Sequence, residues 1–181
     1  SLSSAGRNPR TQRWYSQYEI FNGGGGARPH GDGVSAQDDL VVNVMNGPVE
    51  ALETEFPMRV EAYELVADSG GPGRFRGGLG TRRIWRILAD EASVNLRTDR
   101  FHHSSLGLFG AKPAKPSRAF VNPGTPQERS LTSKIAGLRL KKDDRVIWEL
   151  AGGGGYGPPN ERDPERVRLD VVRGYITADA A

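Results

Sequence analysis

The sequence predicts a mainly β protein of the α+β class, with glycine-rich loops, short peripheral helices and a C-terminal helix. Short apolar runs of strand length recur along the 181 residues, and none approaches the roughly 20 residues that a membrane span needs. The chain also contains 24 glycines and 12 prolines, many of them between these runs. Three glycine clusters carry this pattern, at residues 23–26, 68–80 and 152–155.

The first 17 residues are expected to be an irregular N-terminal segment, because residues 1–11 hold almost no apolar side chains. A strand is expected at residues 14–21. Its expected buried side chains are Tyr15, Tyr18, Ile20 and Phe21.

A short apolar run at residues 40–44 is an expected buried strand, and a short helix is expected over residues 48–55. Asn46 is a plausible N-cap for this helix, and Pro48 suits its first turn. The following strands are expected at residues 58–66, 82–88 and 92–98, and the three-residue link between the last two favours a hairpin.

The central glycine cluster separates two of these strands, and its glycines and proline specify a shaped backbone path. Phe75 is expected to anchor inward in this loop, with Arg74 and Arg76 facing outward. Trp14, Trp85 and Trp148 lie in expected strands, and we expect them to be core or interface anchors.

In the second half of the chain, strands are expected at residues 117–121, 135–140 and 145–150. A helix is expected from Pro164 to Arg173, with Asp163 as its N-cap and Gly174 as its stop.

The composition excludes several classes of function. The absence of cysteine rules out a disulfide framework and thiol chemistry, and is compatible with the cytoplasmic location that we expect. The formal charge is +3 and the pI is about 9.4, but the arginines are dispersed among acids. Neither a nucleic-acid partner nor a membrane partner is therefore expected.

A dinucleotide site is not expected, although residues 152–157 satisfy G-x-G-x-x-G. Two prolines follow where such a site needs the start of a helix. A nest of backbone amides for phosphate remains an alternative. Its candidate is the loop before Arg28, formed by Gly23, Gly24, Gly25 and Gly26. The preferred interpretation is that these glycines only turn corners by reaching φ > 0.

No metal site is assigned to this chain. His102 and His103 are adjacent, so their side chains diverge on regular structure, and His30 is the only other histidine. A site would have to be improvised from His30, Asp32 and distant residues. Surface histidines are the default interpretation.

Several blocks in one order resemble the C-terminal portion of the hydantoinase B/5-oxoprolinase family. This family includes N-methylhydantoinase β subunits and subunits of acetone and acetophenone carboxylases. The matching blocks are residues 23–28 with Asp32 and Gly33, 48–57, 59–65, 68–80, 152–157 with Pro159, 162–164, Asp170, and 174–175. They extend from about Tyr18 onward, so residues 18–181 are expected to form the hydantoinase B-like, β-rich domain.

The resemblance implies a hetero-oligomeric enzyme that opens a cyclic amide such as a hydantoin, 5-oxoproline or a lactam at the expense of ATP. A hydantoinase A-like partner subunit would bind ATP and Mg²⁺, and a longer N-terminal portion of the B-type subunit would hold a divalent metal. The fragment alone is expected to be inactive. Carboxylation of a ketone is the first alternative, and a non-catalytic assembly domain is the second.

Two residues within the matching blocks, Arg28 and Asp32, are the candidate catalytic residues. The arginines of these blocks have a structural alternative, in which they bridge to carboxylates or backbone carbonyls. The four glycines of residues 23–26 are the candidate cofactor-binding residues.

Overall fold

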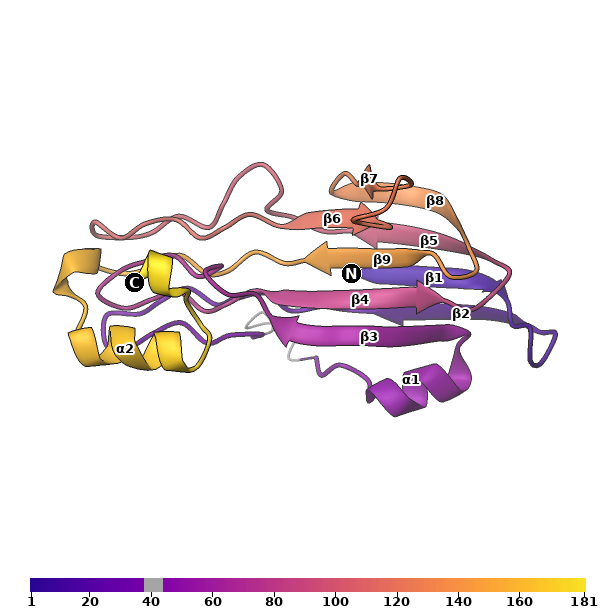
Figure 1. Cartoon of the computed structure of the whole chain (residues 1–181), viewed down its shortest axis with the longest axis horizontal. Coiled ribbons are helices and arrows are strands. Elements are labelled where there is room, and N and C mark those ends of the chain that lie inside the picture. The colour runs from indigo at the N-terminus through magenta and orange to yellow at the C-terminus, as the bar shows by residue number, and fades with distance from the viewer. Residues whose placement is uncertain (38–43) are drawn as a thin grey trace.

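The chain forms two antiparallel β-sheets around one apolar core, with helices at the periphery (Figure 1). The structure is a computed structural model that describes residues 1–37 and 44–181. The expected mainly β fold is confirmed. The strand expected at residues 40–44 lies outside the described residues, apart from Val44.

The first sheet has the strand order β2-β1-β5-β8, and the second has the order β3-β4-β9-β6-β7. The strands of the first sheet are β1 (Leu2–Arg7), β2 (Trp14–Glu19), β5 (Glu91–Arg97) and β8 (Lys134–Lys141). Those of the second are β3 (Met58–Leu65), β4 (Thr81–Ile87), β6 (Arg118–Val121), β7 (Arg129–Ser130) and β9 (Arg145–Glu149).

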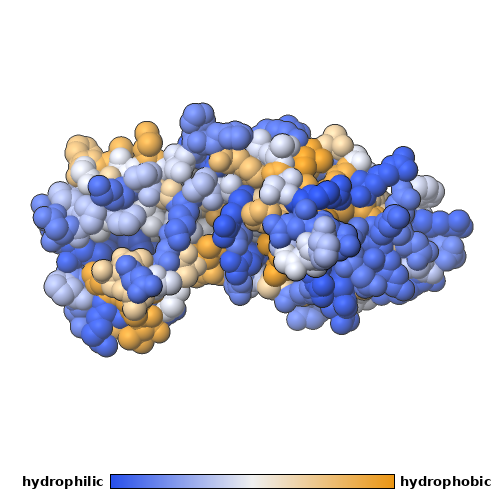
Figure 2. Space-filling view, turned by 45° about the horizontal axis from the view of Figure 1, so that its top comes forward, coloured by the Kyte–Doolittle hydropathy of each residue, from blue (hydrophilic) through white to orange (hydrophobic). Residues whose placement is uncertain are grey.

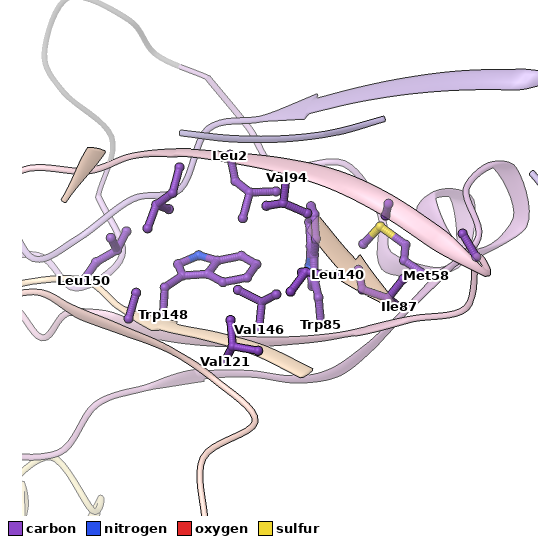
Figure 3. Packing of buried hydrophobic residues seen from close by; sticks show 14 residues of the cluster. Leu2, Met58, Trp85, Ile87, Val94, Val121, Leu140, Val146, Trp148 and Leu150 are labelled. Carbon is purple, nitrogen blue, oxygen red and sulfur yellow. The ribbon is translucent and has the colours of Figure 1, made fainter. Parts of the chain in front are cut away.

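The core lies between the inward faces of these sheets (Figure 3). Alternate residues of β4 and β9 point into it, as the period of two requires. Trp85 and Trp148 meet there edge to face, with ring centroids 5.1 Å apart. Both tryptophans are confirmed as core anchors, whereas Trp14 is 81% exposed on β2.

The expectation of an irregular segment over residues 1–17 is wrong, because this segment contains β1 and most of β2. β1 lies between β2 and β5 and pairs with both. Its inward residues include Leu2 and Ser4, which are 1% and 3% exposed. Small side chains suffice here because ladder hydrogen bonds on both sides hold the strand, and composition does not report those bonds.

The expected burial of Tyr18 is also wrong, since this side chain is 64% exposed. The inward face of β2 instead carries Gln17 and Glu19. Glu19 is held there by an ion pair of 2.8 Å with Arg83, which is 1% exposed. The inward face of this strand thus contains a buried charged pair.

The hairpin expected between β4 and β5 does not form. β4 pairs with β3 and β9, while β5 pairs with β1 and β8. Because both edges of β4 are occupied, the chain crosses through the buried Ala89 into the other sheet. A short link brings strand ends close but does not specify that the strands pair.

In Figure 1, α2 (Pro164–Val172) lies at the left-hand end of the molecule and α1 (Val49–Glu55) lies below β3. α1 starts after Pro48, and Asn46 is not its cap, because the Asn46 side chain bonds Ile20 and Tyr63. α2 begins as expected, with Asp163 accepting from the Glu165 amide. Two 3₁₀ helices flank α2, namely η1 (Pro159–Glu161) and η2 (Ala178–Ala180).

The glycine clusters pack backbone against backbone. The amide of Gly78 donates to the carbonyl of Gly25, and the amide of Gly153 donates to the carbonyl of Gly78, at 2.8 and 2.9 Å. A Cβ on Gly24 would lie 2.0 Å from the Gly78 carbonyl oxygen. Within the three clusters, extended to Gly157, only Gly157 has a positive φ among the glycines. Close backbone approach, rather than the expected φ > 0, is therefore why glycine occupies most of these positions.

The surface differs between the two ends of the molecule. Figure 2 shows mainly hydrophilic residues at its right-hand end and apolar patches toward its left-hand end, which carries α2 in Figure 1. Exposed apolar side chains of the described chain include Leu106, Leu108, Phe109 and Val172.

Glu149 is a buried carboxylate held by two arginines, and it makes the stability of the fold depend on pH. Arg82 and Arg118 both donate to it. Burial alone would raise the pKa of Glu149, but the hydrogen bonds and charges of these arginines outweigh burial and lower that pKa.

We expect Glu149→Gln to flatten the acid side of the stability profile. A depressed carboxyl pKa contributes stability that is present above the unfolded pKa of about 4.3 and is lost as pH falls through the lower folded pKa. Urea unfolding midpoints from about pH 2.5 to pH 7 would therefore fall less steeply in the variant below about pH 4.5. An unchanged acid slope would show that this carboxylate is not a source of the pH dependence.

Candidate functional site

A polar cleft of about 710 Å³ lies beside the first glycine loop. One wall is formed by residues 21–26, a second by residues 150–152, and a third by residues 97–100 at the end of β5. These three segments are far apart in sequence. They meet because β1 pairs with both β2 and β5, and because the glycine clusters bond to one another.

Three arginines line this cleft: Arg28, Arg97 and Arg100. Each is exposed, and none forms an ion pair with an acid in the described part of the chain. Among the lining residues that the structure describes, Asp99 is the one acid, and it pairs with Lys134. The hydrogen bond and charge of Lys134 lower the pKa of Asp99. The described part of the cleft lining therefore carries a net positive charge.

Polar side chains reach the inner part of the cleft. Asn22 is 9% exposed and Thr98 is 8% exposed, and both line the cleft. Neither side chain has a hydrogen-bond partner among residues 1–37 and 44–181. The Ser117 hydroxyl, in contrast, accepts from the Ala151 amide. Asn22 and Thr98 thus offer donors that the protein itself does not use.

The structure places Arg28 in the cleft with the four candidate glycines, as expected from their adjacency in sequence. Gly23 and Gly24 are needed for packing, because a Cβ would lie 2.6 Å from Ala151 O in the first case and 2.0 Å from Gly78 O in the second. Gly26 has open space at this position. The amides of Gly24 and Gly25 donate to backbone carbonyls. A binding role for the four glycines stays a prediction.

Asp32 does not line the cleft. It accepts from both terminal nitrogens of Arg162, at 2.7 and 3.0 Å, and from the amide of Arg76. Burial alone would raise the pKa of Asp32, but Arg162 and then Arg76 lower it. Its catalytic role stays a prediction, since its contacts tie the segment after the first glycine loop to the C-terminal region.

The central loop corrects the expectation for its two arginines. Arg74 is exposed, as expected, but Arg76 is only 6% exposed. Its Nε donates to Asp170 of α2 at 3.1 Å, and its Nη1 donates to the Gly77 carbonyl. The structural alternative, bridging to carboxylates and backbone carbonyls, therefore describes Arg76.

The histidines do not form a site in this structure. His30, His102 and His103 are all exposed. Among the described residues, no three His, Cys, Asp or Glu side chains are arranged to hold a metal ion. In the same described ranges, no helix combines the length and apolar character that a membrane crossing requires.

No sequence pattern groups Arg97, Arg100, Asn22 and Thr98. Arg97 and Thr98 belong to an expected strand, Arg100 belongs to an irregular loop, and Asn22 immediately precedes the first glycine cluster. Only the pairing of β5 with β1 brings them to the same cleft. Knowledge of that strand order would have been needed to find them.

Comparisons with known proteins agree with this architecture. The family model for Hydantoinase B/oxoprolinase matches residues 1–159. A putative D-/L-hydantoinase of Pseudomonas sp. (strain NS671) has a B-type subunit that is 32% identical over 94% of this chain and 29% of its own length. The acetophenone carboxylase delta subunit of Aromatoleum aromaticum is 27% identical over 91% of this chain and 28% of its own length.

A solved structure, the ATP-dependent caprolactamase from Pseudomonas jessenii, matches with a TM-score of 0.84 and 29% identity. The match covers 98% of this chain and 32% of that one. The chain thus spans about 30% of the length of these relatives. On the family match over most of its length, the chain belongs to the Hydantoinase B/oxoprolinase family.

Proposed function

We propose that this chain is the C-terminal part of a B-type subunit in an ATP-dependent enzyme that opens cyclic amides. The observation that supports the proposal is the likeness, over nearly all of this chain, to a hydantoinase subunit and to a caprolactamase. Hydantoins and lactams share a ring amide, so one chemistry serves both substrates. The complex would act in the cytoplasm.

The proposed division of labour assigns ATP and Mg²⁺ to a hydantoinase A-like partner subunit. A divalent metal would be held by the longer N-terminal portion of the B-type subunit. Phosphorylation of the amide oxygen replaces a resonance-stabilised carbonyl by a better electrophile, which explains the use of ATP. This chain would supply a rigid scaffold and the arginine-lined cleft.

Carboxylation of a ketone is the second candidate, favoured by the 27% identity to the acetophenone carboxylase delta subunit. An assembly domain without a chemical role is the third. The first two candidates differ in the substrate that stimulates ATP consumption. The assembly domain differs from both because substitutions in this chain that leave it folded would not change the rate of the reaction.

The experiment is reconstitution of this chain with the remaining B-type portion and an A-type subunit. We expect ADP release that depends on hydantoin, 5-oxoproline or caprolactam, together with the ring-opened product. Replacing Arg28 with Gln in the assembled complex is expected to lower the turnover at least about tenfold, because it removes one charge-assisted contact to an anionic group.

Other results would contradict this proposal. ADP release that responds to acetone or acetophenone plus bicarbonate, and not to cyclic amides, would favour the carboxylase. Full activity of the folded, assembled Arg28→Gln complex would favour the assembly domain, provided that Arg97→Gln and Arg100→Gln are equally active.

A further inference from the structure

We infer that the cleft beside the first glycine loop binds the phosphoryl group of a small phosphorylated molecule. The inference starts from the unpaired positive charge of Arg28, Arg97 and Arg100 around one cavity in the described structure. Guanidinium groups form short, often bidentate hydrogen bonds with phosphate oxygens. A dianionic phosphoryl group has the oxygens and charge to contact more than one of them.

Most arginines outside the cleft are paired with acids, although Arg7, Arg10, Arg13, Arg129 and Arg173 also make no ion pair in the described chain. Twelve arginines elsewhere in the described chain form ion pairs with carboxylates. The three cleft arginines make none within the described ranges, although two of them are separated by only two residues in sequence. The lining acid Asp99 is engaged by Lys134, so an anion bound between the three arginines would offset their mutual repulsion.

The inner wall of the cleft supplies further hydrogen-bond donors for a ligand. Asn22 and Thr98 are each more than nine-tenths buried and line the cleft, and their side chains lack partners in the described structure. Neither residue is among those whose side-chain polar atoms are buried without a partner, so these atoms are accessible to a molecule in the cleft. Their amide and hydroxyl donors suit anionic oxygens, and the amide of Gly26 has no acceptor in the described part.

The shape of the cleft favours a small molecule over a nucleotide. The volume of about 710 Å³ exceeds that of phosphate and leaves room for an attached organic group. Phe21 is the only aromatic residue among the lining residues that the structure describes, and its ring already packs against Trp85 and Trp148. An adenine ring would therefore lack a free aromatic face on which to stack.

The chemical identity of the ligand, unlike the anion site itself, rests on the proposed function. If ATP activates a cyclic amide by phosphorylating its oxygen, the activated substrate carries a phosphoryl group on a small ring. The cleft would then hold that phosphorylated ring. Its arginines would position the anion and shield its charge.

The test is calorimetric titration of this chain with inorganic phosphate and with methyl phosphate, at low ionic strength, without ATP or a partner subunit. We expect saturable binding of one anion. Single Arg28→Gln, Arg97→Gln and Arg100→Gln substitutions should each weaken affinity roughly three- to tenfold, and the triple variant should abolish binding.

Arg129→Gln is the matched control, because Arg129 is exposed on β7, has no ion pair in the described chain and does not line the cleft. It should bind phosphate like the parent. Thr98→Val should also weaken binding while leaving every arginine in place. Circular dichroism and the unfolding midpoint verify that each variant is folded.

Absence of saturable phosphate binding would overturn the inference, as would equal weakening in Arg129→Gln and the cleft variants. If AMP binds more than about tenfold tighter than methyl phosphate, the ligand is a nucleotide and the inference of a small phosphorylated molecule is wrong. Since this titration uses no cyclic amide, its failure is distinguishable from failure of the ring-opening assay. Phosphate binding without ring opening would leave the anion site and remove only the proposed substrate.

Discussion

Replacing Gly24 with Ala is expected to destabilise the fold by at least about 3 kcal/mol, while Gly26→Ala in the same loop is expected to be neutral or stabilising. A Cβ at Gly24 would lie 2.0 Å from Gly78 O and 2.7 Å from Gly153 N. Both obstacles are backbone atoms, which cannot rotate away as a side chain can. The loss is a large fraction of the roughly 5–15 kcal/mol that holds a typical domain together.

Gly26 provides the control because nothing lies within 4 Å of its Cβ position and its φ is not positive. Alanine there reduces the conformational entropy of the unfolded chain, which stabilises by up to about 1 kcal/mol. The two substitutions are chemically identical and two residues apart, yet only Gly24→Ala is expected to destabilise the fold.

Urea unfolding, followed by tryptophan fluorescence, measures both variants. Trp85 and Trp148 are buried in the core, so their emission reports loss of packing. If Gly24→Ala unfolds at the same urea concentration as the parent, the backbone-packed arrangement of the three glycine clusters is wrong. A strongly destabilised Gly26→Ala would indicate that this loop packs more closely than the structure shows.

The sequence predicted those elements whose formation depends on interactions between residues close together in the chain. α2 was predicted with its cap and stop because Asp163, Pro164 and Gly174 act within their own turns. Strand positions such as β4 and β9 followed from local alternation. Sheet membership did not, since the three-residue link after β4 crosses between sheets rather than forming a hairpin.

The candidate site shows the same limit. Arg28 and its preceding glycines line the same cleft because they are neighbours in sequence, and their role stays a prediction. Arg97 and Thr98 join them only through the pairing of β1 with β5, which no local pattern encodes. Asp32 is also close to Arg28 in sequence, but its ion pair with Arg162 turns it toward α2.

Removing the Asp170 carboxylate is expected to cost about 3–5 kcal/mol. Its Oδ2 accepts from Arg76 Nε at 3.1 Å and from Arg162 Nη2 at 2.7 Å. The side chains of all three residues are at most 9% exposed. Asp170→Ala leaves Arg76 without its carboxylate and Arg162 with only Asp32, so buried positive charge loses its compensation.

The higher helix propensity of alanine opposes the loss of folding stability expected for Asp170→Ala. Alanine favours a helix more than aspartate does by about half a kcal/mol, so a weaker α2 cannot explain destabilisation. Arg168→Ala is the matched control on the same helix, because Arg168 pairs only with Glu165 within the described chain and both side chains are exposed. It should leave the unfolding midpoint nearly unchanged.

The network joins α2 to the central glycine cluster and, through Asp32, to the segment that follows the first one. We therefore expect amide hydrogen exchange in Asp170→Ala to accelerate in α2 and also around residues 32–33 and 76–78. Acceleration confined to α2 would show that the helix undocks without loosening the glycine clusters. In that case the clusters are held by their own backbone hydrogen bonds, and the ion network only attaches the C-terminal region to them.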